Sequence, residues 1–207
     1  MSDTKQRRVD NGIMRLALDA TNATLGKNGY AAVLHLARLE RYLEAPPADS
    51  AGLTTPGEDF SALLSSIFTM YGEQASRGIF RRWGRHFGLA GINRRTSARL
   101  LKPMLSLLPF QRRAQTVLNA LVNEANAARG EELHTLQMLP EAYRITLRDC
   151  LYCHDLHPTE TVCYAIVGTL EAVLLWGTGR EFYVRETQCM ACGAAACVFE
   201  IHKTRHD

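Results

Sequence analysis

The sequence predicts an α+β fold, in which an antiparallel sheet is packed with helices and the N-terminal half is helical. Two patterns lead to this prediction: apolar residues recur at helical spacing before Gly130, and apolar and polar residues alternate as in strands after it. The predicted order is several helices, two strands, one helix and two more strands, and strands grouped in pairs are typical of antiparallel pairing. We therefore expect residues 1–130 to be the helical part of one domain, with dimerisation and pocket helices, and residues 131–207 to be its α+β part.

The helical part is predicted to begin with an amphipathic helix over residues 11–25, whose apolar side chains fall roughly on one face. Residues 26–29 interrupt this helix with two glycines, and a helical pattern resumes over residues 30–43. After a loop rich in proline and glycine, residues 60–71 keep the i, i+3, i+4, i+7 spacing of a third helix. We expect the apolar face of the first helix to be exposed and to form a homodimer interface.

A basic stretch follows the third helix. Residues 76–113 contain ten lysines and arginines and no acidic residue, so the rest of the chain carries −7 to give the net charge of +3. We expect an acidic group, in this chain or in a partner, to lie against this stretch. Glycines within residues 84–91 predict a helical or turn-rich conformation, and Pro103 and Pro109 bracket a segment rich in leucine.

The pattern changes towards the C-terminus. Residues 111–128 predict a helix that ends before Gly130, a C-cap signal. Residues 143–147 alternate between apolar and polar side chains, as expected of a strand with one buried face. Pro158 suits the first turn of a helix that runs to Trp176. The strands and the helix of this part are predicted at residues 133–139, 143–150, 158–176, 181–186 and 197–202.

Composition places the chain among ordinary globular proteins, with 46% hydrophobic and 22% charged residues. Its first residues do not have the pattern of a signal peptide. Its apolar runs are shorter than the roughly 18 residues that a membrane span requires. We expect a soluble, cytoplasmic protein with reduced cysteines.

The cysteines are concentrated near the C-terminus, a distribution that favours a metal site. Glu186, Cys189 and Cys197 come at the end of one predicted strand, in the following turn and at the start of the next strand, so a hairpin end would bring them together. Cys163, in the preceding helix, can supply a fourth ligand. Three thiolates and one carboxylate satisfy tetrahedral zinc and leave no position for water, which predicts a structural site. The six cysteines are Cys150, Cys153, Cys163, Cys189, Cys192 and Cys197.

Two other interpretations of the cysteines remain open from spacing alone. The pairs Cys150–Cys153 and Cys189–Cys192 both have the CxxC spacing, and four thiolates from them would make a zinc ribbon or an iron–sulfur site. Alternatively, the cysteines are buried side chains that pack as small apolar groups.

The C-terminal residues carry a resemblance to a known family. Cys163, Glu186, Thr-Gln-Cys189 and Cys197-Val-Phe-Glu-Ile resemble the C-terminal signature of the 4-vinyl reductase domain family, and Cys150-Leu-Tyr-Cys153 before the helix fits the same family. The family includes a bacteriochlorophyll-synthesis protein and the sensor domains of phenol-responsive transcriptional activators. The motif covers about residues 140–202.

This resemblance implies a usually dimeric domain that binds small molecules. It implies zinc at Cys163, Glu186, Cys189 and Cys197, beside an apolar ligand pocket, and it leaves the other three cysteines without a role. We expect the chain to bind or carry an apolar or aromatic molecule, with a tetrapyrrole pigment intermediate as one candidate, while zinc locks the lid of the pocket and a partner protein reads the change. Residues considered for the pocket are Phe68, Tyr71, Ile79, Phe80, Trp83, Phe87, Tyr164 and Trp176.

Two further functions are alternatives. The first is a reductase of a pigment vinyl group that uses an iron–sulfur centre or an external electron donor; the sequence has no Gly-rich dinucleotide fingerprint after a strand, and no catalytic residue is assigned. The second is a nucleic-acid-binding regulator, because aromatic residues interleave with the arginines of residues 76–113. An amphipathic helix with a solvated basic face shows the same spacing, and nucleic acid is therefore the less favoured partner.

Overall fold

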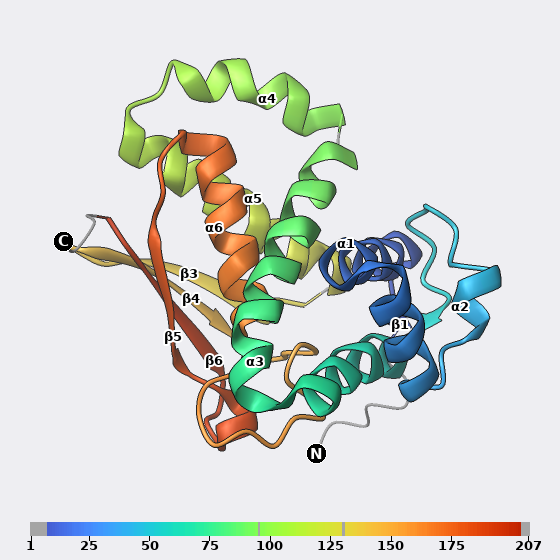
Figure 1. Cartoon of the computed structure of the whole chain (residues 1–207). Coiled ribbons are helices and arrows are strands. Elements are labelled where there is room, and N and C mark those ends of the chain that lie inside the picture. The colour runs from blue at the N-terminus through green and yellow to red at the C-terminus, as the bar shows by residue number, and fades with distance from the viewer. Residues whose placement is uncertain (1–7, 95, 130, 204–207) are drawn as a thin grey trace.

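A four-stranded antiparallel sheet and the helices packed against it form the molecule (Figure 1). The computed structural model describes residues 8–94, 96–129 and 131–203. The predicted α+β class, with a helical N-terminal half and paired strands, is confirmed. The strands follow the order β3-β4-β6-β5, with β3 (His134–Met138), β4 (Ala142–Leu147), β5 (Tyr183–Gln188) and β6 (Cys197–His202).

The two faces of the sheet differ in polarity. Tyr143 and Ile145 of β4 lie opposite Ile201 and Phe199 of β6, and all four side chains are buried. The residues between them point to the other face, where Arg144 of β4 donates to the carboxylate of Glu200 over 2.9 Å. The alternation predicted for this strand is therefore the one expected of a sheet with one buried and one solvated face.

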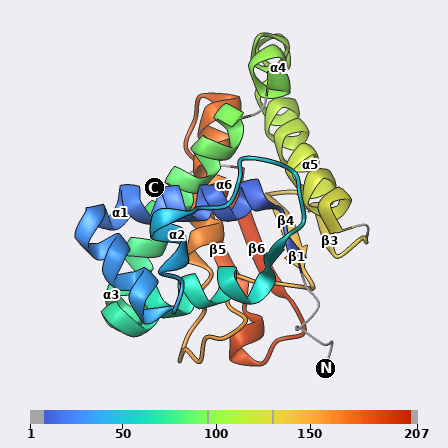
Figure 2. The same cartoon turned by 90° about the vertical axis from the view of Figure 1, so that its right-hand side faces the viewer.

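Helix α6 (Tyr164–Thr178) is the central helix. It packs against α3 (Gly57–Arg94) on one side and against α5 (Phe110–Arg129) and β5 on the other (Figures 1 and 2). Two glycines let α3 and α6 approach closely: a Cβ at Gly84 would lie 1.9 Å from the carbonyl oxygen of Ala165, and one at Gly168 would lie 2.0 Å from that of Arg81. Residues 84–91, predicted as helical or turn-rich, are entirely helical because their glycines serve this packing.

Helix α1 (Asn11–Leu36) turns at Gly26, where φ is 71° and ψ is 173°, so the predicted interruption is confirmed. The helix ends at Leu36, followed by a short α2 (Arg41–Glu44), whereas the sequence predicted one helical segment to residue 43. The apolar face of α1 packs against α3 and is buried, with Leu16 and Ala17 at 5% and 0% exposure. The prediction that this face is free to form a dimer is wrong.

Helix α3 also contains a turn, at Gly72 with φ 74°, which redirects the chain after the predicted third helix (Figure 1). Beyond α3, α4 (Thr96–Ser106) projects from the rest of the molecule and contains Pro103, so this proline does not bound a segment as predicted. Pro109 does lie between α4 and α5. The C-cap predicted at Gly130 lies outside the described residues.

The start of α6 differs from the prediction. Residues 158–163 are not helical, because their backbone amides are bound by distant carboxylates: Glu73 of α3 accepts from the amides of Thr159 and Glu160, and Glu186 accepts from that of Cys163. A two-residue sheet of β1 (Arg8–Val9) and β2 (Thr55–Pro56) was not predicted either.

The basic stretch finds acidic partners within the chain, as one of the two expectations had it. The carboxylate of Glu171, on α6, accepts from both Arg81 and Arg85 of α3, with the Arg85 contact at 2.9 Å. Arg77 pairs with Glu160, and Arg94 pairs with Asp49. Among the described residues, none of the helices combines the length and the apolar character that crossing a bilayer requires.

Candidate metal centre

Five cysteines and one glutamate meet where the connection between β4 and α6 touches the β5–β6 hairpin. We call this connection, residues 148–163, the cysteine loop; the structure describes all of it, and it has neither helix nor strand. The loop supplies two cysteines near its start and one at its end, where it caps α6. The hairpin supplies the glutamate from β5, one cysteine from the turn and one from the start of β6. The six residues are Cys150, Cys153, Cys163, Glu186, Cys189 and Cys197, all buried.

The four predicted zinc ligands are brought together. The ligand atoms of Cys163, Glu186, Cys189 and Cys197 all lie within 4.8 Å of one another, and we call these residues the hairpin quartet. The Sγ atom of Cys163 is 3.9 Å from that of Cys189 and 3.8 Å from that of Cys197. Four ligands at Zn–S bonds of about 2.3 Å stand about 3.8 Å apart in a tetrahedron, so the separations suit a zinc ion.

A second quartet, not predicted in this combination, shares two of these cysteines. Cys150, Cys153, Cys163 and Cys197 also lie within 4.8 Å of one another, and we call them the loop quartet. The Sγ atoms are 3.7 Å apart between Cys150 and Cys163 and 3.6 Å apart between Cys153 and Cys197. Cys192 is exposed and belongs to neither quartet, so the described residues do not form the site that two CxxC pairs would make.

The hairpin turn places its ligands by local geometry. A 3₁₀ turn over Met190–Cys192 ends at Gly193, whose φ of 89° favours glycine. The turn folds the chain back so that the amide of Met190 donates to the Sγ atom of Cys197 over 3.3 Å. The tight turn that glycine was expected to permit is thus present.

Burial perturbs the acidity of the carboxyl group in this cluster. Desolvation, with a smaller effect from Cys189, raises the pKa of Glu186 to about 8. Its Oε2 atom accepts a hydrogen bond of 2.8 Å from the amide of Cys163, whereas its Oε1 atom is buried and has no partner among the described residues. A buried acceptor without a partner costs free energy, which a bound cation would recover.

The thiols perturb one another. Hydrogen bonds from Cys153 and Cys163 lower the pKa of Cys189 to about 6, and hydrogen bonds from neighbouring thiols, first that of Cys150, lower the pKa of Cys197 to about 6. Hydrogen bonds with its neighbours, first with Cys150, raise the pKa of Cys163. Two thiols of the cluster therefore ionise readily, and thiolate is the form that binds metal.

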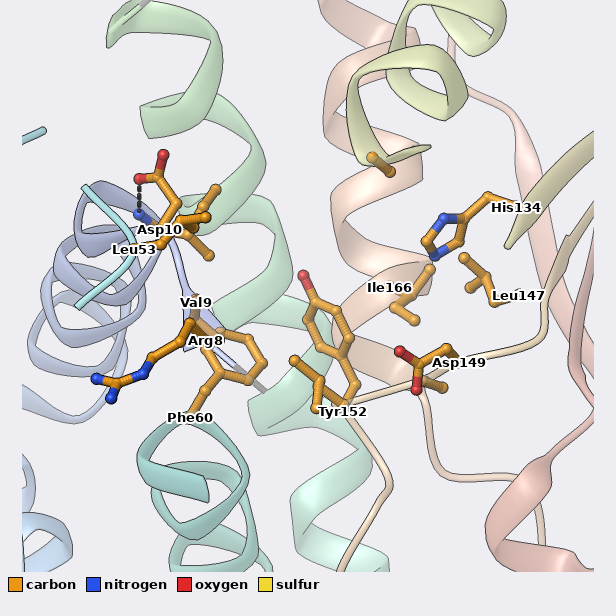
Figure 3. Close-up of a pocket in the computed structure, with 14 residues that line it drawn as sticks. Arg8, Val9, Asp10, Leu53, Phe60, His134, Leu147, Asp149, Tyr152 and Ile166 are labelled. Carbon is orange, nitrogen blue, oxygen red and sulfur yellow. Dashed lines mark hydrogen bonds between the residues drawn. The ribbon is translucent and has the colours of Figure 1, made fainter. Parts of the chain in front are cut away.

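A cavity of 190 Å³ adjoins the cysteine loop, and we call it the loop cavity (Figure 3). Phe60 and Val9 line one side of it, and Ile166 and Leu147 line the other, with Tyr152 between them. His134 and Asp149 add polar atoms at the edge. Cys150 also lines this cavity, so one residue of the loop quartet belongs to its wall.

A larger cavity of 330 Å³, which we call the helical cavity, lies among α1, α3, α4, α5 and α6. Two of the predicted pocket residues, Phe87 and Trp176, line it. Arg94 and Glu124 bring charge to a lining that is otherwise mainly apolar. The two cavities are neighbours, because both are lined by Asp10 and Ile13.

The other predicted pocket residues lie elsewhere. Phe80 and Trp83 are buried in the core, where the indole of Trp83 donates to the hydroxyl of Thr21 over 2.9 Å. Phe68, Ile79 and Tyr164 are half-buried against the core, and Tyr71 is 37% exposed. The sequence analysis missed Phe60, Tyr152 and Ile166. The position of Tyr152 inside the first CxxC pair was the one local signal that pointed to it.

Comparison with known proteins agrees with the resemblance. Residues 143–203 match the family model of the 4-vinyl reductase domain. The match confirms the resemblance over β4, β5, β6, α6 and both quartets. No protein of curated function matches the chain in sequence.

Solved structures extend the likeness to the helical half. A crystal structure of an H-NOX protein from S. oneidensis in the Fe(II)NO ligation state is 12% identical, with a TM-score of 0.61, covering 94% of this chain and 98% of that one. An NMR structure of a mutant H-NOX domain from Shewanella oneidensis in the Fe(II)CO ligation state is 14% identical, with a TM-score of 0.56 and the same coverage of 94% and 98%. The phenol-responsive sensory domain of the transcription activator PoxR, with phenol, is 19% identical, with a TM-score of 0.48, covering 69% of this chain and 72% of that one. At these identities the likeness concerns the fold alone.

Proposed function

We propose that this chain is a small-molecule-binding domain that takes an apolar or aromatic molecule in the loop cavity and uses a bound metal to hold the wall of that cavity. The observation that carries the proposal is the double position of Cys150. Its side chain lines the cavity, and its Sγ atom lies 3.7 Å from that of Cys163 in the metal centre. A ligand that presses on this wall therefore acts on a segment that the metal holds.

The lining of the loop cavity suits a small aromatic molecule. An engineered apolar cavity of about 150 Å³ binds benzene, and the loop cavity, at 190 Å³, has room for one substituted ring. The ring of Tyr152 meets that of Phe60 edge to face, with centroids 5.2 Å apart, which leaves aromatic surface at the cavity. Tyr152, His134 and Asp149 offer polar atoms that would orient a hydroxyl group.

Zinc at the hairpin quartet is the metal part of the proposal. Three cysteines and Glu186 provide four ligands, so the ion would have no open position and would serve structure rather than catalysis. The unpartnered Oε1 atom of Glu186 supports a cation here. Bound ligand would shift the balance between conformations of the cysteine loop, and a partner protein would respond to that shift. A cytoplasmic setting, which keeps thiols reduced, stays a prediction.

The alternatives have less support. In a cubane iron–sulfur cluster each cysteine binds a different iron, so the four sulfurs stand further apart than the ligands of one ion; separations of 3.6 to 3.8 Å in the loop quartet favour single ions. A tetrapyrrole is large for cavities of 190 and 330 Å³, since sites for drug-sized ligands span about 300–1,000 Å³. A homodimer stays a prediction without an assigned surface.

The test compares two substitutions on the same helix. Ala125 and Ala120 both belong to α5, but Ala125 lines the loop cavity and Ala120 lines the helical cavity. We expect phenol to bind the unaltered protein in calorimetric titrations, to lose at least tenfold in affinity in Ala125→Phe, and to bind normally in Ala120→Phe. Loss in Ala120→Phe alone would move the site to the helical cavity. No binding to any form would refute a site for single-ring aromatics.

A further inference from the structure

We propose that the cysteine cluster is a binuclear metal centre in which the thiolates of Cys163 and Cys197 bridge two divalent ions. One ion would take Cys150 and Cys153 as its remaining ligands, and the other would take Glu186 and Cys189. The inference rests on the metal part of the proposed function and goes beyond the single zinc that the family resemblance implies.

The membership of the two quartets carries the inference. They share two cysteines, Cys163 and Cys197, and each adds two ligands of its own from a different segment of the chain. Two tetrahedra that share an edge need six ligands in this arrangement, with the two shared ligands close to both ions. The shared edge, between the Sγ atoms of Cys163 and Cys197, is 3.8 Å long, the length expected in a zinc tetrahedron, about 3.8 Å.

Each half of the centre has an observation of its own. In the loop quartet, the Sγ atoms of Cys150 and Cys153 lie 3.7 and 3.6 Å from those of the two shared cysteines. In the hairpin quartet, Glu186 is only 8% exposed, and its Oε1 atom has no hydrogen-bond partner among the described residues. A single ion would satisfy one of these observations and leave the other without a ligand.

Charge gives a physical reason for two ions. Five thiolates and one carboxylate carry six negative charges in a buried cluster, and an uncompensated buried charge is costly. One divalent ion leaves two ligands that must stay protonated, whereas two ions hold all six in the metal-binding form. Bridging thiolates lower the number of ligands required from eight to six, the number that this cluster contains.

The second ion would have a structural task that the first does not have. Cys150 and Cys153 stand near the start of the cysteine loop and Cys163 stands at its end, so an ion in the loop quartet closes the loop on itself. Long connections without secondary structure are uncommon in domains unless they have a function. Because the first residues of this loop line the loop cavity, the ion in the loop quartet, rather than the one in the hairpin quartet, fixes the ligand-facing wall.

The first measurement is the metal content of the full chain, purified with reductant and without chelator. We expect two zinc ions per chain in the unaltered protein and one in the double variant Cys150→Ser/Cys153→Ser. Glu186→Gln with Cys189→Ser should also retain one, and Cys192→Ser, whose thiol is exposed and outside both quartets, should retain two.

The second measurement needs no variant and therefore does not depend on how well the variants fold. Cobalt(II) is added stepwise to the metal-free protein. We expect thiolate-to-cobalt absorption to rise until two ions are bound, and the electron paramagnetic resonance signal to rise with the first ion and fall with the second, because bridging thiolates couple the two spins.

The outcomes separate this inference from the proposed function. Two zinc ions with loss of the cobalt resonance signal at the second ion support the binuclear centre. One zinc ion, lost in Cys189→Ser but kept in the double variant of Cys150 and Cys153, overturns it and leaves the zinc site of the hairpin quartet intact. Absence of bound metal overturns both, while phenol titrations still test the cavity independently. Two uncoupled cobalt ions overturn the bridging thiolates.

Discussion

The helix pair α3–α6 and the cysteine loop are ordered by opposite means. The helices hold each other through apolar side chains, two closely packed glycines and a buried carboxylate, all supplied by the chain itself. The cysteine loop has no regular backbone hydrogen bonding and gathers thiols instead. The helix pair therefore folds on the strength of its own contacts, whereas the loop requires an ion. A region whose order depends on a ligand is the one that can respond to another ligand beside it.

Metal removal is expected to have the largest effect, confined to one side of this comparison. Chelation should lower the free energy of unfolding by several kcal/mol, less than the roughly 10–16 kcal/mol of zinc-finger peptides, because the helix pair stays folded. Hydrogen exchange should accelerate in residues 149–157, while α3 and α6 keep their protection and the far-ultraviolet circular dichroism changes little. A uniform rise in exchange would remove the distinction between the two regions.

Glycine substitution should break the helix pair without touching the metal. In Gly84→Ala the new Cβ meets the carbonyl oxygen of Ala165, so the helices must separate, and we expect a loss of about 2–3 kcal/mol in urea unfolding. Gly78 is a matched control in the same helix, because a Cβ there has open space. Gly78→Ala should stabilise the protein by up to about 1 kcal/mol through helix propensity. Equal signs for the two variants would show that the close approach does not matter.

These contacts also explain which parts of the structure the sequence could predict. Strand β6 was predicted within its observed bounds, because alternation and a glycine turn are local signals. The start of α6 was not, since Glu73 and Glu186, far away in sequence, bind the amides that a helix beginning at Pro158 would have used. The glycines of α3 suggested flexibility and instead serve packing against a helix that lies some 80 residues further along the chain.

The metal centre divides in the same way. A hairpin brings Glu186, Cys189 and Cys197 together by local geometry, and the structure places these three ligand atoms within 4.8 Å of one another. Cys150 and Cys153 lie in a loop whose course depends on contacts such as the hydroxyl of Ser61 donating to the carbonyl oxygen of Leu151 over 3.3 Å. No spacing rule contains such a contact, and the sequence left their partners open. Only the fold brings them to Cys163.

The buried carboxylate of the helix pair should have an intermediate effect. Glu171 accepts from Arg81 and Arg85, and Glu171→Gln removes the charge while keeping the shape. We expect a loss of about 1–2 kcal/mol, below the 3–5 kcal/mol of a fully buried pair, because the two arginines are 46% and 53% exposed. Glu160→Gln is the control, since Glu160 is 63% exposed beside Arg77, and it should cost at most about 0.5 kcal/mol. Similar losses in both variants would contradict a special role for burial.

The smallest effect is expected at the one cysteine outside the comparison. Cys192 is exposed in the hairpin turn, next in sequence to Gly193, and Cys192→Ser should change the free energy of unfolding by less than about 0.5 kcal/mol and leave the metal content unaltered. Cys189→Ser, three residues away in the same turn, removes a ligand and should release metal and cost several kcal/mol. Metal analysis and urea unfolding of the two variants, side by side, test whether burial in a quartet rather than membership of a CxxC pair makes a cysteine a ligand. Equal loss of metal from both would return Cys192 to the site and favour the arrangement of two CxxC pairs.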